Sequence, residues 1–256
     1  GSEFLMGKII HLENERIHDA TNLVKEVFFS SGNLGLDRNA AKSFLEFLSM
    51  HAKDLTWIGY MDPDVKGVLA YTEGHLSLLF VRKEDTHAGI ATKLVQYFLQ
   101  EEKEAGIQRI TLNALGSSVG FYKSLGFEKA GEPSKAGGME YQLMEYLMGR
   151  ENLGKVVSVR VDQRYGSLHS IIPDLCLPCN IGYVEDYTQE DFQDAYIYGV
   201  YEPVEQFKGV VIGIIYHRDE SETRWIVASG NQYDRQDVLQ VIAPLETDYD
   251  VRIEWL

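Results

Sequence analysis

Apolar and polar residues follow two different periods along the first part of the chain. Apolar residues recur at helical spacing over 15–30, 38–52 and 90–105, which predicts three amphipathic helices. Runs rich in β-branched and aromatic residues between turn residues predict strands, and a short helix is expected at 118–125. The expected strands are 7–13, 56–61, 66–72, 75–82, 108–114 and 139–147.

The pattern changes after residue 150. A single helix is expected at 234–242, and the other segments are strand-like runs rich in Val, Ile, Tyr and Trp. These runs are 156–161, 210–216, 224–228 and 249–255. The short polar link Gly149-Arg150-Glu151 separates the two patterns. We therefore predict two domains of an α+β protein, 6–149 and 150–256, after a Gly1-Ser2-Glu3-Phe4 segment that we interpret as a vector remnant.

Charge narrows the classes of partner. The chain has 39 acidic and 24 basic residues, a net charge of −15, of which −11 falls after residue 150. Nucleic acids and anionic membranes attract basic surfaces, so neither is expected as a partner. No apolar run approaches the roughly 20 residues of a membrane span. We expect a soluble cytoplasmic protein whose acidic surface favours a cationic acceptor over an anionic one.

The two cysteines are not expected to do chemistry. Cys176 and Cys179 are too few for a disulfide scaffold and supply half of a four-thiolate zinc site. Pro178 and the apolar neighbours indicate a buried strand or turn. We therefore expect no metal site here.

The segment Lys83-Glu84-Asp85-Thr86-His87-Ala88-Gly89-Ile90-Ala91 leads from a strand into the long helix. The first N–H groups of a helix have no partner within it, and together with the helix dipole they favour an anion. Gly89 would let the backbone approach a phosphate closely, and Ala91 is small enough to avoid a clash. This turn is a candidate pyrophosphate site, although glycine alone also fits an ordinary strand–helix turn.

A second motif, Asn113-Ala114-Leu115-Gly116-Ser117-Ser118-Val119-Gly120-Phe121-Tyr122-Lys123-Ser124-Leu125-Gly126-Phe127, follows. Together with the turn, with the strand Leu78-Leu79-Phe80-Val81 and with the order of elements, it resembles the GNAT superfamily of acetyltransferases over residues 7–148. The resemblance implies an acetyl-CoA-binding fold with a mixed central sheet flanked by helices. It departs from the family at Thr86, where a Gln or Arg is usual, so one phosphate contact is in doubt and His87 is the candidate substitute.

The resemblance also implies roles for individual residues. Tyr122 would face the thioester sulfur and donate a hydrogen bond to the departing thiolate. The motifs do not identify the base: Glu73 and His75, at the start of the fourth strand, are candidates by position, as are Glu140 and ordered water. Acetyl-CoA as co-substrate would be held by Phe80 and Val81 along its pantetheine arm, by Thr86, His87, Ala88, Gly89, Ile90, Ala91 and Thr92 at its pyrophosphate, and by Asn113, Ser118 and Tyr122 on the other side.

The tail carries a different resemblance. Leu177-Pro178-Cys179-Asn180-Ile181-Gly182-Tyr183, followed by Gln189-Glu190-Asp191-Phe192-Gln193-Asp194, is similar to soluble inorganic pyrophosphatases, which have a small β-barrel. Gln189 and Ile181 replace an aspartate and a tyrosine of that pattern, leaving Asp191, Asp194 and Asp219. A cluster that lacks ligands and basic partners binds magnesium poorly. We therefore expect a non-catalytic barrel whose strand edges serve docking or homo-oligomer formation.

The sequence thus predicts an N-acetyltransferase that moves an acetyl group from acetyl-CoA to the amine of a small molecule or of a protein, by direct attack in a ternary complex. Two alternatives stay open. One is a magnesium-dependent hydrolase of pyrophosphate or a phosphoester in the second domain, regulated by the first. The other is a module that binds acetyl-CoA without transferring the acetyl group.

Overall fold

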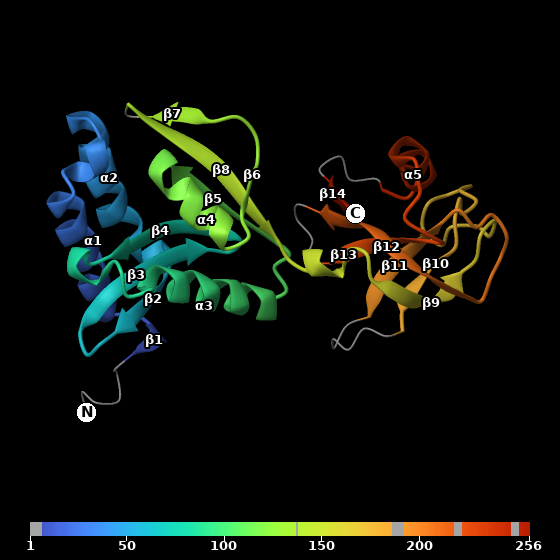
Figure 1. Ribbon diagram of the computed structural model, residues 1–256, viewed down its shortest axis with the longest axis horizontal. Helices are drawn as coiled ribbons and strands as arrows, with labels where there is room; N and C mark the ends of the chain where they lie inside the picture. The colour runs from blue at the N-terminus through green and yellow to red at the C-terminus, as the bar shows by residue number, and fades with distance from the viewer. Residues whose placement is uncertain (1–6, 137, 186–191, 218–221, 247–250) are drawn as a thin grey trace. The chain divides into compact units, whose positions relative to one another are not determined.

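The computed structural model of the 256-residue chain describes residues 7–136, 138–185, 192–217, 222–246 and 251–256. The chain divides into two compact units, Gly1–Met148 and Gly149–Leu256, called unit 1 and unit 2 below. Figure 1 shows the elements of both.

Unit 1 alternates helices and strands in the order that the sequence predicts, with two extra short strands. Its α-helices are α1 (Arg16–Ser30), α2 (Arg38–His51), α3 (Ile90–Glu104) and α4 (Val119–Ser124). Short 3-10 turns lie at η2 (Asn33–Gly35), η3 (Ala52–Asp54), η4 (Lys83–Asp85) and η5 (Gly116–Ser118). The strands are β1 (Lys8–His11), β2 (Thr56–Met61), β3 (Val65–Thr72), β4 (His75–Val81), β5 (Arg109–Leu115), β6 (Glu128–Lys129), β7 (Ser134–Ala136) and β8 (Met139–Leu147).

These strands form one mixed sheet in the order β1-β2-β3-β4-β5-β8-β6, with β7 paired to β8. Only β4 and β5 pair in parallel, and the other neighbours are antiparallel. A parallel pair needs a long crossover, which here contains α3. The single parallel contact therefore lies in the middle of an otherwise antiparallel sheet.

Helices cover both faces of this sheet, so that unit 1 has three layers (Figure 1). Alternate residues of a strand point to opposite faces. Val68 and Ala70 of β3 accordingly lie in the core under α1 and α2, whereas Leu69 lies in the core under α3. Trp57 is fully buried in the first of these cores, and its indole N–H donates to the Ala52 carbonyl over 2.8 Å. Residues of β3 and β4 therefore pack into both cores, one on each face of the sheet.

Unit 2 is a small barrel. Its strands are β9 (Val156–Gln163), β10 (Ile181–Val184), β11 (Gln193–Tyr198), β12 (Gln206–His217), β13 (Thr223–Ala228) and β14 (Val251–Trp255). The strand order β13-β11-β10-β9-β12 closes into a barrel because β12 also pairs with β13. Strand β14 pairs with the second half of β12, from Gly213 to His217. Helix α5 (Arg235–Ile242) packs Val238 and Ile242 against the barrel core.

The predicted elements are confirmed, with four strands added. The sequence pattern overlooked β6, β7, β10 and β11, which are short or contain polar residues that mask an alternating pattern. Residues 249 and 250 of the last predicted strand lie outside the described residues. Among the described helices, none has the length and apolar character that a membrane crossing requires.

The two cysteines are free thiols in different surroundings. Cys179 is buried in the barrel core, where burial raises the pKa of its thiol to about 12. Cys176 is exposed, so the expectation of burial is wrong for this residue. It lies in an isolated bridge with Leu168, which leaves its side chain at the surface.

A close approach of two strands gives the first prediction. At Gly182 of β10, a Cβ atom would overlap the Arg160 carbonyl oxygen of β9 and lie 2.7 Å from its carbon. Neither backbone atom can move without breaking the pairing. We expect Gly182→Ala to lower the stability of unit 2 by about 3 kcal/mol. The control Gly230→Ala, with no atom near its added Cβ, should stay within about 0.5 kcal/mol. Calorimetry of the full chain measures both, and equal stability of the two variants would contradict the prediction.

Candidate functional site

The candidate site begins where β4 and β5 separate. The two strands pair only at His75–Thr111 and Leu76–Leu112, at the start of the parallel contact. Beyond Leu76, β4 remains paired with β3 as far as the Val81–Gly67 contact, but it no longer pairs with β5. The edge of β4 that faces β5 is therefore free to accept an extended ligand as an added strand.

A cavity of about 450 Å³ occupies this gap. Its lining comes from the separated strands β4 and β5, from η5 and α4, and from α1, the η2 segment, α2 and β8. The residues that line it are Val27, Leu34, Leu36, Phe44, Phe47, Leu76, Ser77, Leu78, Leu79, Phe80, Val81, Leu112, Asn113, Ala114, Leu115, Ser118, Tyr122 and Tyr141. The structure thus brings Phe80, Val81, Asn113, Ser118 and Tyr122 together around one cavity.

The turn from β4 into α3 follows the end of the separated part of β4. Gly89 adopts a left-handed conformation with φ 74°, and no side chain caps the start of α3. The N–H groups of the first helical turn are therefore available to an anion. Residues 86–89 are exposed, as a ligand contact requires. The Thr86 hydroxyl donates to the Lys83 carbonyl over 3.0 Å, so its proton is already used within the turn.

Packing holds the start of α3 in position. A Cβ atom on Gly67 of β3 would come within 2.8 Å of the Ile90 side chain and 3.2 Å of Leu94. The absence of that atom allows the first turn of α3 to lie directly on the sheet. Ile90 is buried there, while the residues just before it remain exposed. The anion-binding end of the helix is thereby fixed relative to β4.

Tyr122 is the buried titratable group of the cavity. It lies on α4 and its ring packs between Phe121 and Phe127, with centroid distances of 5.1 and 5.6 Å. Burial raises the pKa of its phenol to about 12. The hydroxyl therefore stays protonated near neutral pH and can donate a hydrogen bond, whereas giving its proton outright to a thiolate of pKa about 8.5 is strongly uphill.

None of the three side chains suggested as a base lines the cavity. Glu73 is exposed in the β3–β4 turn, at the end of β4 where the strands are still paired. His75 bonds through its Nδ1 to the Thr111 hydroxyl over 2.8 Å, and burial lowers its pKa. Glu140 is exposed and adjoins Tyr141, so that it points to the opposite face of β8. The structure therefore does not bring Glu73 to the other site residues.

The helical wall of the cavity was not identified as part of the site from the sequence. Phe44 and Phe47 fit the apolar stripe of α2, and such a stripe ordinarily indicates core. Phe47 is nevertheless 40% exposed. Leu34 in η2 has a positive φ of 57°, which is rare for a residue with a bulky side chain and marks a strained turn in the cavity lining. The residue types around Leu34 do not predict this backbone conformation.

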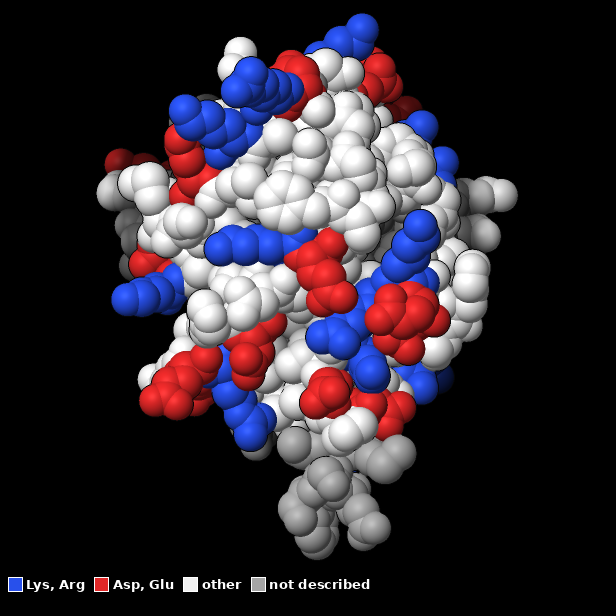
Figure 2. All heavy atoms as spheres, turned by 90° about the vertical axis from the view of Figure 1, so that its left-hand side faces the viewer, with Lys and Arg blue, Asp and Glu red and all other residues white. Residues whose placement is uncertain are grey.

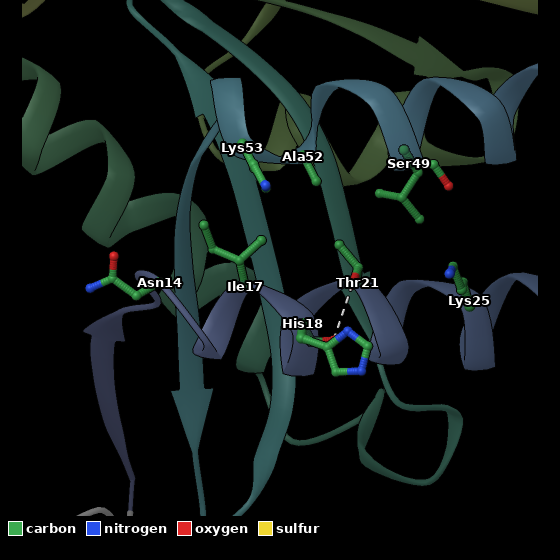
Figure 3. Close-up of a pocket in the computed structure, with 9 residues that line it drawn as sticks. Asn14, Ile17, His18, Thr21, Lys25, Ser49, Ala52 and Lys53 are labelled. Atoms are coloured by element: carbon green, nitrogen blue, oxygen red, sulfur yellow. Dashed lines mark hydrogen bonds between the residues drawn. The ribbon is translucent and has the colours of Figure 1, made fainter.

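A second hollow, of about 270 Å³, lies between α1 and the end of α2 (Figure 3). Its lining includes His18, Lys25 and Lys53, and the Thr21 hydroxyl donates to the His18 carbonyl over 3.0 Å. No residue implied by the resemblance lies there. The face of unit 1 in Figure 2 intermixes basic and acidic side chains, so it presents no field of a single sign.

Unit 2 has a hollow of its own, of about 340 Å³. It is lined by Asp162, Asp194 and Arg224 among others, and Arg224 is the one Lys or Arg among the described lining residues. Burial, and then the neighbouring Glu222, raises the pKa of Asp194. Asp191 and Asp219 lie outside the described residues. The remaining described side chains include no group of three or more that could hold a metal ion.

Comparison with known proteins agrees with this geometry. Residues 36–148 match the family model of the acetyltransferase (GNAT) domain. No curated protein matches the chain. Among solved structures, the chain is similar to the PaiA N-acetyltransferase of Thermoplasma acidophilum in complex with coenzyme A, at 18% identity and a TM-score of 0.45 over 55% of this chain and 98% of that one. It is also similar to the ribosomal-protein-alanine N-acetyltransferase of Brucella melitensis, at 15% identity and a TM-score of 0.43 over 55% and 98%.

The matched segment contains every residue that lines the cavity except Val27 and Leu34. It also contains the turn before α3 and the separation of β4 from β5. The fold expected from the sequence is therefore confirmed: unit 1 has the GNAT fold, and a closed barrel with few helices follows it.

Proposed function

We propose that unit 1 transfers the acetyl group of acetyl-CoA to an amine. The observation that carries the proposal is the separation of β4 from β5, which opens a cavity between a free strand edge and Tyr122 in a domain that matches the GNAT family model. The geometry supplies a groove for an extended thioester and a second wall for an acceptor. The hydrolase alternative in unit 2 has no comparable support.

In this proposal acetyl-CoA lies along the separated part of β4. The backbone of Phe80 and Val81 pairs with the pantetheine arm, and Asn113 and Ser118 border it from β5 and η5. The pyrophosphate binds the turn formed by Thr86, His87, Ala88, Gly89, Ile90, Ala91 and Thr92. Because the Thr86 hydroxyl is engaged with Lys83, these contacts come mainly from backbone N–H groups and the dipole of α3.

The chemistry needs few groups. The amine nitrogen attacks the thioester carbonyl, its carbon–nitrogen bond forms, and N–H donors stabilise the oxyanion. The carbon–sulfur bond then breaks, and the thiolate leaves while it accepts a hydrogen bond from Tyr122. The proton of the new amide nitrogen passes to water, since Glu73, His75 and Glu140 do not line the cavity.

Thiol release from acetyl-CoA with a panel of amines tests the function directly. Release that depends on both the amine and the enzyme supports transfer. Saturable binding of acetyl-CoA without release for any amine would support the non-enzymatic binding module instead.

The turn before α3 gives a prediction for cofactor affinity. Valine at position 89 would have to adopt φ near 74°, which a β-branched residue strongly disfavours, so the turn should change shape. We expect Gly89→Val to weaken acetyl-CoA binding at least about tenfold, or about 1.4 kcal/mol, by titration calorimetry. Gly166→Val, with φ 80° and no neighbour within 4 Å, is a control with the same strain in unit 2. Equal affinity in a folded Gly89→Val protein would contradict the prediction.

Tyr122 gives a prediction for the rate. Removal of its hydroxyl should lower kcat by about tenfold or more, because its hydrogen bond strengthens as the sulfur gains charge. The KM for acetyl-CoA should change much less. Tyr60→Phe, on β2 and outside the cavity, is the matched control and should keep the wild-type kcat. A wild-type kcat for Tyr122→Phe with saturating acceptor would assign Tyr122 to the core alone.

We further propose that unit 2 binds or assembles rather than catalyses. The family match ends at residue 148, so the resemblance to pyrophosphatases stays a prediction. Closure of the barrel removes most strand edges, and β14 is the strand left at an open edge among those described in unit 2. Self-association through unit 2 would therefore use β14. Free thiols and the need for acetyl-CoA favour a cytoplasmic location.

The barrel proposal predicts that the full chain releases no phosphate from pyrophosphate with magnesium or manganese. Asp194 is partly buried and its pKa is raised, which makes its carboxylate a weaker metal ligand, and one arginine cannot neutralise a pyrophosphate. Metal-dependent phosphate release that is lost in Asp194→Asn would overturn this proposal and favour the hydrolase alternative.

A further inference from the structure

The acceptor side of the cavity is uncharged. Its wall consists of Val27 from α1, Leu34 and Leu36 from the connection, Phe44 and Phe47 from α2, and Tyr141 from β8. Every described residue that lines the cavity is apolar or neutral, and the ionisable side chains among them are Tyr122 and Tyr141.

Among the residues that the structure describes, no carboxylate on the same elements lines the cavity. Glu145 on β8 pairs with Arg109. Asp19 on α1 and Glu46 on α2 are exposed outside the lining. Glu26 on α1 pairs with Arg82, with 3.7 Å between Oε2 and Nε. Asp37 accepts the Ala40 N–H over 2.8 Å and caps α2. Glu140 is exposed on the other face of β8. No described carboxylate lines the cavity to pair with an ammonium group.

The charge of the incoming amine therefore decides whether it reaches the thioester. Moving an unpaired ammonium ion from water into an uncharged cavity costs several kcal/mol. The neutral amine avoids that cost, and it is also the form that can attack the carbonyl. Without a base in the cavity, the proton must be lost before the amine enters.

This inference rests on the proposed function and names its substrate class. We propose that the acceptor is a weakly basic amine attached to an apolar or aromatic group, bound against Phe44, Phe47 and Leu34, and that lysine side chains and polyamines are poor acceptors. This proposal departs from the expectation, drawn from overall charge, of a cationic acceptor.

The pKa of the acceptor sets the size of the effect. A peptide α-amino group has a pKa of about 7.7–8.0 and a lysine side chain about 10.4, so near pH 7 the neutral fraction of the α-amine is larger by roughly 300-fold. Two peptides can isolate this difference. One has a free amino group on a leading leucine and no lysine, and the other is N-terminally acetylated with a single lysine next to leucine.

The experiment compares kcat/KM for the two peptides and for spermidine at pH 7, with the full chain and acetyl-CoA. We expect the α-amine peptide to exceed both other acceptors by about 100-fold or more. A lysine peptide or spermidine that equals or exceeds it overturns the inference while leaving the proposed function intact. Thiol release with none of these three acceptors, despite acetyl-CoA binding, overturns this inference, and release with any other amine of the panel then keeps the proposed function.

A pair of variants tests whether the cavity wall causes the preference. Phe47→Glu places a carboxylate on the wall at a 40% exposed position. It should lower the ratio of kcat/KM for the α-amine peptide to kcat/KM for the lysine peptide about tenfold. Met50→Glu adds the same charge on the same helix at a 73% exposed position outside the cavity, and should leave the preference unchanged. An equal change in both variants would assign the effect to overall charge and overturn the inference.

Discussion

The separation of β4 from β5 is the constraint on which the rest of the site depends. A sheet gains stability from every pair of strands that bonds along its length, and here one central contact is given up after two residue pairs. Other contacts compensate for this loss. β4 stays bonded to β3 as far as Val81, β5 stays bonded to β8 along its full length, and α3 covers the junction. The open edge exists because its neighbours hold both strands firmly, so a ligand finds a rigid groove and need not order a flexible loop.

The separation of β4 from β5 also connects the free edge of β4 with the start of α3. The strand that loses its partner leads through η4 directly into the glycine at the start of α3, so the free edge and the uncapped helix end are consecutive in the chain. Gly67, one strand away, allows that helix end to lie against the sheet. On the other side, β5 leads through η5 into α4, which carries Tyr122 into the cavity. The pyrophosphate turn and the Tyr122 side of the cavity are therefore continuations of the two separated strands, whereas α1, η2, α2 and β8 supply the remaining lining.

The sequence predicted the parts of the site whose chemistry is local. Gly89, the Asn113–Phe127 motif and the amphipathic helices show themselves in spacing and residue type, and the structure places Phe80, Val81, Asn113, Ser118 and Tyr122 around one cavity. It could not predict which end of β4 lies open, because that depends on pairing between strands 36 residues apart, and so it suggested Glu73 at the closed end. The sequence also could not show that Phe47 lies at an exposed part of the cavity while Phe44 packs against the core, because both residues belong to the same apolar stripe of α2. Short strands such as β10 and β11 form because they pair with neighbouring strands in the closed barrel, and a local sequence pattern does not show such pairing.

The surface and the cavity act on the acceptor in opposite ways. The net charge of −15, of which −11 lies after residue 150, attracts protonated amines to the protein as a whole. Under the proposal made above, the neutral lining favours molecules that have lost the proton, so the long-range field would affect the rate of encounter and the wall would determine chemical selection. A strongly basic amine gains from the first effect but loses more in the second, because several kcal/mol of desolvation exceed the screened attraction of distant charges. The two effects combine favourably for an amine that is partly protonated in solution, attached to an apolar group, and readily deprotonated at the mouth of the cavity.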